Sequence, residues 1–188
     1  MTLYHVSEDP NITQFVPRVP ARADLDKSRG LVWAIDDGHL PNFLTPRDCP
    51  RVTYHAGEGT TQEDIERFFS STHRHCVAIE HAWFERMRDT ALYIYEFDPA
   101  NFILQDECAG YYVSEQIEVP IVKTQIDDLF GELFKRGVEL RLVNNLWPLR
   151  DAVMQSSLQF SICDFANAQP REAPFACEGG ARRAGGAL

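Results

Sequence analysis

The residues with the clearest chemical potential lie between Thr45 and Arg51, where the sequence reads T-P-R-D-C-P-R. The two prolines restrict the backbone of this segment, and the two arginines supply planar donor groups that match carboxylates and phosphates. We therefore predict a rigid turn in which Arg47 and Arg51 either bind an anionic ligand or brace the fold through an internal bond to Asp48. Cys49 would serve as a nucleophile only with a histidine base beside it in space, which a sequence does not reveal.

A histidine, a hydroxyl group and a third arginine occur near the N-terminus. His5 lies in the short run Leu3 to Val6, which has the residue types of a β-strand, and Ser7 follows it. Because imidazole titrates near neutral pH, His5 is a candidate general base or ligand contact; the alternative is a half-buried histidine bonded to a backbone carbonyl. Arg18 follows a proline and suits anion recognition.

Two later segments combine aromatic and polar side chains. Asp36 ends the run V-W-A-I-D, which contains Trp33, and its carboxylate could act as an acid, a base or a hydroxyl acceptor, or simply cap a short helix. In the strand G-Y-Y-V-S-E, alternation places Tyr112 and Ser114 on one face and Glu115 on the other. The sequence therefore gives three candidate catalytic residues, His5, Asp36 and Glu115, and seven candidate substrate-binding residues, Ser7, Arg18, Trp33, Arg47, Arg51, Tyr112 and Ser114.

The sequence gives little support for a metal site. His73 and His75 would share one face of a strand, which suits two imidazole ligands. A third ligand is not specified, although His55, Glu80 and His81 are candidates, so we expect no metal. The chain also lacks the Walker, G-x-G-x-x-G, G-x-S-x-G, H-E-x-x-H and EF-hand patterns.

Composition narrows the class of protein. The chain has 188 residues, of which 44% are hydrophobic and 24% charged, which fits a single globular domain. The net charge of -10 argues against broad binding to nucleic-acid backbones or anionic lipid. No apolar run approaches the ~20 residues that a membrane span requires. Five cysteines without a C-x-x-C pair, and no recognisable secretory signal, lead us to expect a cytoplasmic protein.

The elements that must position these residues are short. The clearest strand is 91–97, and the strongest helix signal is 124–136, where Thr124 and Asp127 form a capping pair and Gly137 ends the apolar stripe. Thr60 begins a second capping box, before another helix. Further strands are expected at 3–6, 31–35, 51–55, 76–79, 102–104, 110–114, 117–122 and 139–143, and further helices at 39–44, 81–88 and 146–157.

Because strands follow one another without regular intervening helices, the pattern predicts an α+β fold. We expect one domain over residues 1–167, with mixed, mostly antiparallel sheets and about four helices. Residues 168–188 are rich in Ala, Gly, Pro, Arg and Glu, and they are expected to form a disordered tail.

Six short motifs together resemble a family of small microbial proteins of unknown function. They are L-Y-H-V-S-E, F-V-P-R, V-W-A-I-D, P-R-D-C-P-R, G-Y-Y-V-S and L-W-P-L, spread over residues 3–165. The P-R-D-C-P-R block is the most specific of them. This resemblance implies no known reaction.

A second similarity is to the ADP-ribosyltransferase-like fold, including its RNA 2′-phosphotransferase and DNA-modifying branches. Proteins of that fold begin with a strand ending in L-Y-H, and the resemblance implies that His5 contacts the ribose of NAD. Trp33 would take the aromatic position of a later strand, where those proteins have tyrosine. The acid would come from 111–120, with Glu115 or the pair Gln116 and Glu118 as candidates, although Gly and Tyr stand where the usual glutamate opens that strand.

These observations leave three functional hypotheses. The second resemblance implies a protein that binds NAD or another nucleotide, and that transfers ADP-ribose or acts on a nucleotide-derived substrate. One alternative is a cofactor-independent isomerase, cyclase or hydrolase that draws its acid and base from His5, Asp36, Asp48 and Glu115. The other is a non-catalytic binding module in which the arginine-rich turn is structural.

Overall fold

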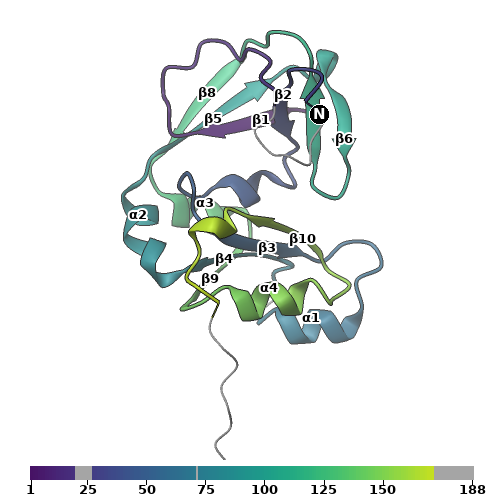
Figure 1. The fold of residues 1–188 in the computed structure, drawn as a ribbon, viewed down its shortest axis with the longest axis vertical. Coiled ribbons are helices and arrows are strands. Elements are labelled where there is room, and N and C mark those ends of the chain that lie inside the picture. The colour runs from purple at the N-terminus through teal and green to yellow at the C-terminus, as the bar shows by residue number, and fades with distance from the viewer. Residues whose placement is uncertain (20–26, 71, 172–188) are drawn as a thin grey trace, which may run out of the picture.

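The computed structural model describes residues 1–19, 27–70 and 72–171, and its strands form two sheets that lie one above the other in Figure 1. The larger sheet is antiparallel throughout, with the strand order β6-β7-β2-β1-β5-β8. Its strands are β1 (Leu3–Ser7), β2 (Val32–Ile35), β5 (Leu92–Phe97), β6 (Ile103–Asp106), β7 (Tyr111–Ser114) and β8 (Val122–Ile126).

The smaller sheet has the order β10-β3-β4-β9 and contains one parallel pair, β4 with β9. Its strands are β3 (Arg51–His55), β4 (His75–Glu80), β9 (Glu139–Val143) and β10 (Gln159–Cys163). The α-helices are α1 (Gln62–Phe68), α2 (Phe84–Asp89), α3 (Leu129–Lys135) and α4 (Trp147–Val153), and short 3-10 turns include η1 (Leu40–Phe43) and η4 (Phe165–Asn167). The α+β prediction, with mostly antiparallel sheets in a single compact domain, is confirmed. Within the described ranges, no helix is long and apolar enough to cross a membrane.

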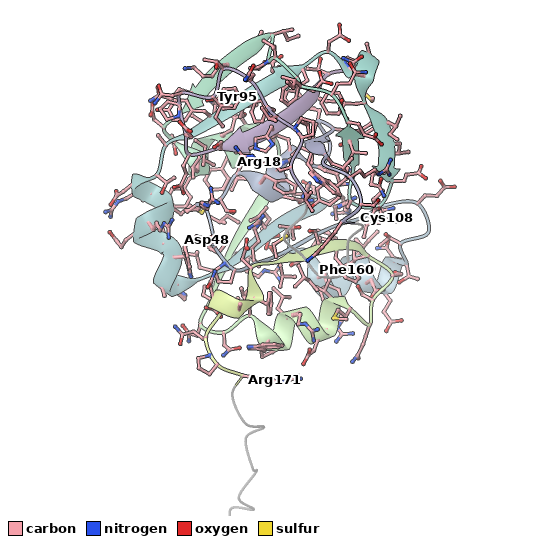
Figure 2. All side chains as sticks on the ribbon, turned by 45° about the horizontal axis from the view of Figure 1, so that its top comes forward. Arg18, Asp48, Tyr95, Cys108, Phe160 and Arg171 are labelled. Atoms are coloured by element: carbon pink, nitrogen blue, oxygen red, sulfur yellow. The ribbon has the colours of Figure 1, made fainter. Side chains whose placement is uncertain are left out.

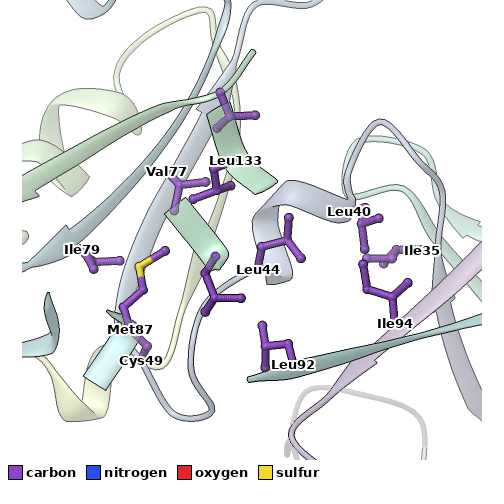
Figure 3. Close-up of a cluster of buried hydrophobic side chains, with 12 residues drawn as sticks. Ile35, Leu40, Leu44, Cys49, Val77, Ile79, Met87, Leu92, Ile94 and Leu133 are labelled. Atoms are coloured by element: carbon purple, nitrogen blue, oxygen red, sulfur yellow. The ribbon is translucent and has the colours of Figure 1, made fainter. Parts of the chain in front are cut away.

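The main hydrophobic core lies between the two sheets. Strand β4 shows how alternation builds it, because Val77 and Ile79 face this core while Cys76 and Ala78 face the opposite side of the small sheet. Figure 3 shows Val77, Ile79 and Met87 on one side of Leu44, with residues of η1 and the large sheet on the other. Leu40 of η1 and the following Leu44 therefore fill the space between the sheets together with side chains of α2 and α3, namely Met87, Leu129 and Leu133.

Two further clusters cover the outer faces. Helices α1 and α4 pack against the small sheet, where Phe68 and Val153 join Val52 and Tyr54 of β3. The outer face of the large sheet buries Leu3, Tyr95 and Phe97, and the segment around Phe15 packs over them. His5 and Ser7 share this outer face with Leu3 because strand side chains alternate.

The predicted helix at 124–136 is wrong in its first half. Residues Val122–Ile126 form the edge strand β8 and pair with β5, so that Thr124 lies opposite Ile94. The helix begins later, where the Asp128 side chain accepts a hydrogen bond from the Gly131 amide at 2.9 Å. The strand expected at 117–122 is correspondingly displaced, and Glu118 instead forms an isolated bridge with Phe15. Pairing with a neighbouring strand outweighs the local capping signal.

Other boundaries also differ from the predictions. Thr61, not Thr60, caps α1, because its hydroxyl accepts from the Asp64 amide at 3.2 Å. The helix at 146–157 is shorter than expected, and β10 follows it where no strand was predicted. Of the predicted tail, residues 168–171 are described and are hydrogen-bonded to the domain, whereas 172–188 lie outside the described residues.

A glycine at the start of β7 controls how closely the strands approach η1. Gly110 has φ +65°, and its carbonyl accepts a hydrogen bond from the Asp36 amide at 3.2 Å. A Cβ at Gly110 would lie 2.1 Å from His39 Nδ1. A side chain at this position would therefore push His39 out of place.

We predict that Gly110→Ala destabilises the fold by roughly 3 kcal/mol, since it combines left-handed backbone strain with a steric clash. Gly59→Ala is the matched control, because Gly59 has φ +86° but nothing lies within 4 Å of where its Cβ would stand. It should cost only about 1 kcal/mol. Urea denaturation measures both values, and equal costs would contradict the clash.

Candidate functional site

Three cavities adjoin one another around His5, and we call them together the His5 cleft. The charged cavity, of about 300 Å³, lies between the end of β1 and the T-P-R-D-C-P-R turn. The outer cavity, of about 350 Å³, lies between the large sheet and residues 12–19, and it shares His5, Ser7 and Arg47 with the charged cavity. The aromatic cavity, of about 100 Å³, shares His5 and Phe43 with the charged cavity. His5 lines all three.

The His5 ring is fixed in one orientation. Its Nδ1 lies 3.1 Å from the carbonyl oxygen of Trp33, and its ring centroid lies 4.7 Å from that of Phe15. Because a carbonyl only accepts, Nδ1 must carry the proton, which leaves Nε2 of the neutral ring with a free lone pair. Burial lowers the pKa of His5, and the charge of Arg18 lowers it further against the opposing effect of the Trp33 carbonyl. His5 is thus a neutral hydrogen-bond acceptor at neutral pH. Its bond to the Trp33 carbonyl is also the one expected of a half-buried histidine with a structural role.

Arg51 braces the fold from the edge of the charged cavity. Its side chain is only 8% exposed, and its Nε donates to the carbonyl of Asn42 at 2.7 Å. Its Nη1 donates to the carbonyl of Cys49 at 3.1 Å and to the carboxylate of Asp164 at 2.8 Å. The guanidinium also lies 5.5 Å from the centre of the Phe43 ring. The predicted internal ion pair therefore joins Arg51 to Asp164 and not to Asp48.

Arg47 and Arg18 differ from Arg51 because their guanidinium groups are exposed. The Arg47 side chain is 78% exposed, and its one ion pair among residues 1–19, 27–70 and 72–171 is a long contact of 4.0 Å with Asp48. Arg18 is held through its backbone, which bonds to Leu31 in both directions at 3.0 and 3.1 Å. No hydrogen bond or ion pair within the same ranges occupies the Arg18 guanidinium. Both arginines line the outer cavity and can reach an anion there.

Two aspartates with left-handed backbone conformations line the charged cavity. Asp48 has φ +63° and Asp164 has φ +56°, and they are the non-glycine residues with positive φ in the described chain. Such conformations cost free energy in residues with a Cβ and cluster at functional sites. The strain therefore falls on two residues that both line this cavity's arginine-rich edge.

The aromatic cavity is lined by rings in edge-to-face contact. The centroid of Tyr111 lies 5.4 Å from that of Trp33 and 5.9 Å from that of Phe43. Tyr111 packs toward the core between the sheets, whereas Tyr112 packs on the outer cluster. Tyr111 is therefore the tyrosine of β7 that lines the cleft, and Tyr112, the candidate predicted from the sequence, is not.

The remaining candidate residues lie outside the His5 cleft. Asp36 accepts hydrogen bonds from the amide and the Nδ1 of His39 at 2.9 and 2.8 Å, and it thereby holds the turn before η1, whose cap residue is His39. Glu115 is exposed and forms an ion pair with Arg29. Ser114 is buried and donates to the carboxylate of Glu118 at 2.5 Å. The structure thus brings His5, Ser7, Arg18, Trp33, Arg47 and Arg51 together, but not Asp36, Glu115, Tyr112 or Ser114.

The histidines and Cys49 have other surroundings than the sequence suggested. His75 bonds to Asn42 at 2.8 Å and lies in a row with His55 and His39, with ring centroids 5.2 Å apart at each step and the rings tilted or edge-to-face. Among the described residues, no three His, Cys, Asp or Glu side chains are grouped to hold a metal ion. Cys49 is fully buried, and burial raises its pKa to about 12, so it lacks the thiolate character of a nucleophile.

Replacing Arg51 and Arg47 one at a time distinguishes an arginine that stabilises the fold from one that is available to a ligand. We predict that Arg51→Ala lowers the free energy of unfolding by about 3 kcal/mol, because the carboxylate of Asp164 and the carbonyls of two buried residues, Asn42 and Cys49, lose their donor. Arg47→Ala should change it by less than about 0.5 kcal/mol, as is usual for an exposed side chain. Chemical denaturation of the two variants tests this, and similar losses for both would contradict the assigned division of roles.

The comparisons with known proteins bear on family but not on reaction. No curated protein and no solved structure matches the chain. The similarity to the ADP-ribosyltransferase-like fold is therefore not supported. A family model does match residues 4–168, which contain the T-P-R-D-C-P-R turn and every residue of the His5 cleft. The chain thus belongs to DUF6886, a family of unknown function, as the first resemblance led us to expect.

Proposed function

We propose that this protein binds a small molecule of nucleotide type, with a planar ring system and one or more phosphates, in the His5 cleft. The observation that carries the proposal is the position of His5, which lines a charged, an outer and an aromatic cavity at once. The charged and outer cavities each have a volume in the usual range for ligand sites. The three cavities differ in the side chains that line them, so a ligand that extends from the charged and outer cavities into the aromatic cavity needs a charged end and a ring end.

The phosphate end is assigned to Arg47 and Arg18. Both guanidinium groups are exposed at the cleft, and arginine forms paired, charge-assisted hydrogen bonds with phosphate oxygens. Acidic side chains nearby are largely engaged already, since Glu8 accepts from the Arg47 amide at 2.7 Å and Asp164 from Arg51. Asp48 is the acidic residue that competes most directly for Arg47.

The ring end is assigned to the aromatic cavity. Trp33, Phe43 and Tyr111 present ring faces and edges around a space that suits a single planar group rather than a whole ligand. Between the two ends, His5 offers a lone pair on Nε2 that can accept a hydrogen bond from a ligand hydroxyl, such as that of a ribose.

Acid–base catalysis at the same site is a second candidate, favoured by the lowered pKa of His5. A neutral imidazole with a fixed tautomer can take a proton from a hydroxyl. In this version Asp48, which lines the charged cavity, replaces Asp36 and Glu115 as the acidic partner. NAD is one ligand of this class, but Glu115, the acid that ADP-ribosyl transfer would need, pairs with Arg29 away from the cleft.

Isothermal titration calorimetry with ATP, NAD, adenosine and pyrophosphate tests the proposal. We predict that ATP or NAD binds more tightly than adenosine or pyrophosphate alone. Only the whole nucleotide places phosphates at the two arginines and a ring in the aromatic cavity. Arg18→Ala and Arg47→Ala should each weaken nucleotide binding about tenfold, the effect of losing one charge-assisted contact.

Arg88→Ala is the matched control, since Arg88 is a half-exposed arginine of α2 paired with Glu85 and Asp89, outside the cleft. It removes the same charge and should leave the dissociation constant unchanged. The proposal is wrong if no nucleotide binds below millimolar concentration, or if Arg88→Ala weakens binding as much as Arg47→Ala.

A further inference from the structure

The segment that follows β10 lies beside the arginine-rich turn and carries polar groups that the nucleotide site does not explain. We call residues 164–171 the strap. It begins at Asp164, continues through η4, and leads to Arg171, which Figure 2 labels at the lower end of the molecule. Asp164 is part of the charged cavity, so the strap contributes directly to the wall of the His5 cleft.

Two strap side chains hold the turn at successive points. Asp164 accepts from Arg51 at 2.8 Å, and Asn167 Nδ2 donates to the carbonyl of Asp48 at 2.9 Å. That carbonyl belongs to the residue directly after Arg47, and Asp48 has the left-handed conformation that needs outside support. Within the described turn, the Cys49 amide also bonds to the Pro46 carbonyl at 3.1 Å, which closes the loop locally.

The far end of the strap is anchored to the small sheet. Glu80, of which 1% is exposed, accepts hydrogen bonds from the Gln169 amide at 3.0 and 3.2 Å and from the Leu146 amide at 3.1 Å. The indole of Trp147 donates to the Gln169 carbonyl at 3.0 Å. One residue separates Gln169 from Asn167, so the amide group of Asn167 is held on a fixed backbone.

We infer that Asn167 is a positioning residue, which sets the direction of Arg47 toward the phosphate of the ligand by fixing the Asp48 peptide. This inference rests on the proposed function. Asn167 itself touches none of the three cavities around His5, so its effect on a ligand must pass through the turn. Removing its amide should free the turn without removing any group that contacts the ligand.

Two variants of Asn167 test this, with hydrogen exchange and calorimetry as separate readouts. Asn167→Asp keeps the shape but replaces the donor by a carboxylate, and Asn167→Ala removes it. We expect both to speed exchange of the Cys49 amide about tenfold and to weaken ATP binding about fivefold, with little change in the thermal midpoint. Arg171→Ala is the control, because it cuts the strap's contact with Asp151 and the Trp147 ring but does not reach the turn. It should change neither readout.

Unchanged exchange at Cys49 in both Asn167 variants overturns the inference, whatever the calorimetry gives. Faster exchange with an unaltered dissociation constant also overturns it, because the strap would then hold a turn that does not govern binding. Absence of ATP and NAD binding to the unsubstituted chain overturns the proposed function, and with it the ligand part of this inference. Equal effects of Arg171→Ala and Asn167→Ala would show general loosening of the strap and likewise count against the inference.

Discussion

A single buried guanidinium, that of Arg51, determines how the parts of this molecule meet at the cleft. The Arg51 side chain is 8% exposed, and its positive charge needs a partner because an unpaired buried charge is strongly destabilising. Its acceptors come from three elements: the carbonyl of Asn42 in η1, the carbonyl of Cys49 in the turn, and the carboxylate of Asp164 in the strap, which lies 113 residues further along the chain. The helix between the sheets, the arginine-rich turn and the strap are thereby fixed relative to one another.

Because of this constraint, the three arginines near the cleft have different roles. Because Arg51 is committed to internal acceptors, the charge offered to a ligand is that of Arg47 and Arg18, both of which are exposed. His5 remains neutral beside them, since burial and the Arg18 charge lower its pKa. A neutral acceptor next to two exposed cations suits a ligand that has hydroxyl groups close to phosphates. The rigid brace and the proposed site are thus consequences of one arrangement of charges.

Local patterns predicted much of the fold, and long-range pairing decided the rest. Alternation revealed most strands, and a proline-rich turn with two arginines identified one edge of the cleft. The predicted start of α3 is too early because Thr124 looks like a cap, while its pairing opposite Ile94 is invisible in the sequence. The sequence likewise could not show that Tyr111 and not Tyr112 lines the cleft, since the face that meets the core depends on which sheet face η1 covers. Asp164 and Asn167 carry no local signal, because their partners lie more than 110 residues away.

The proposed site depends most directly on His5 as a neutral hydrogen-bond acceptor in the ligand-binding cleft. Nitrogen-15 NMR of histidine-labelled protein reports the tautomer, the pKa and ligand contact of that ring in one experiment. We predict a proton on Nδ1, a pKa below the ordinary value, and a shift of the Nε2 resonance on adding ATP, with the exposed His81 unaffected. A proton on Nε2 at neutral pH, or an Nε2 resonance that does not respond to saturating nucleotide, would contradict the account.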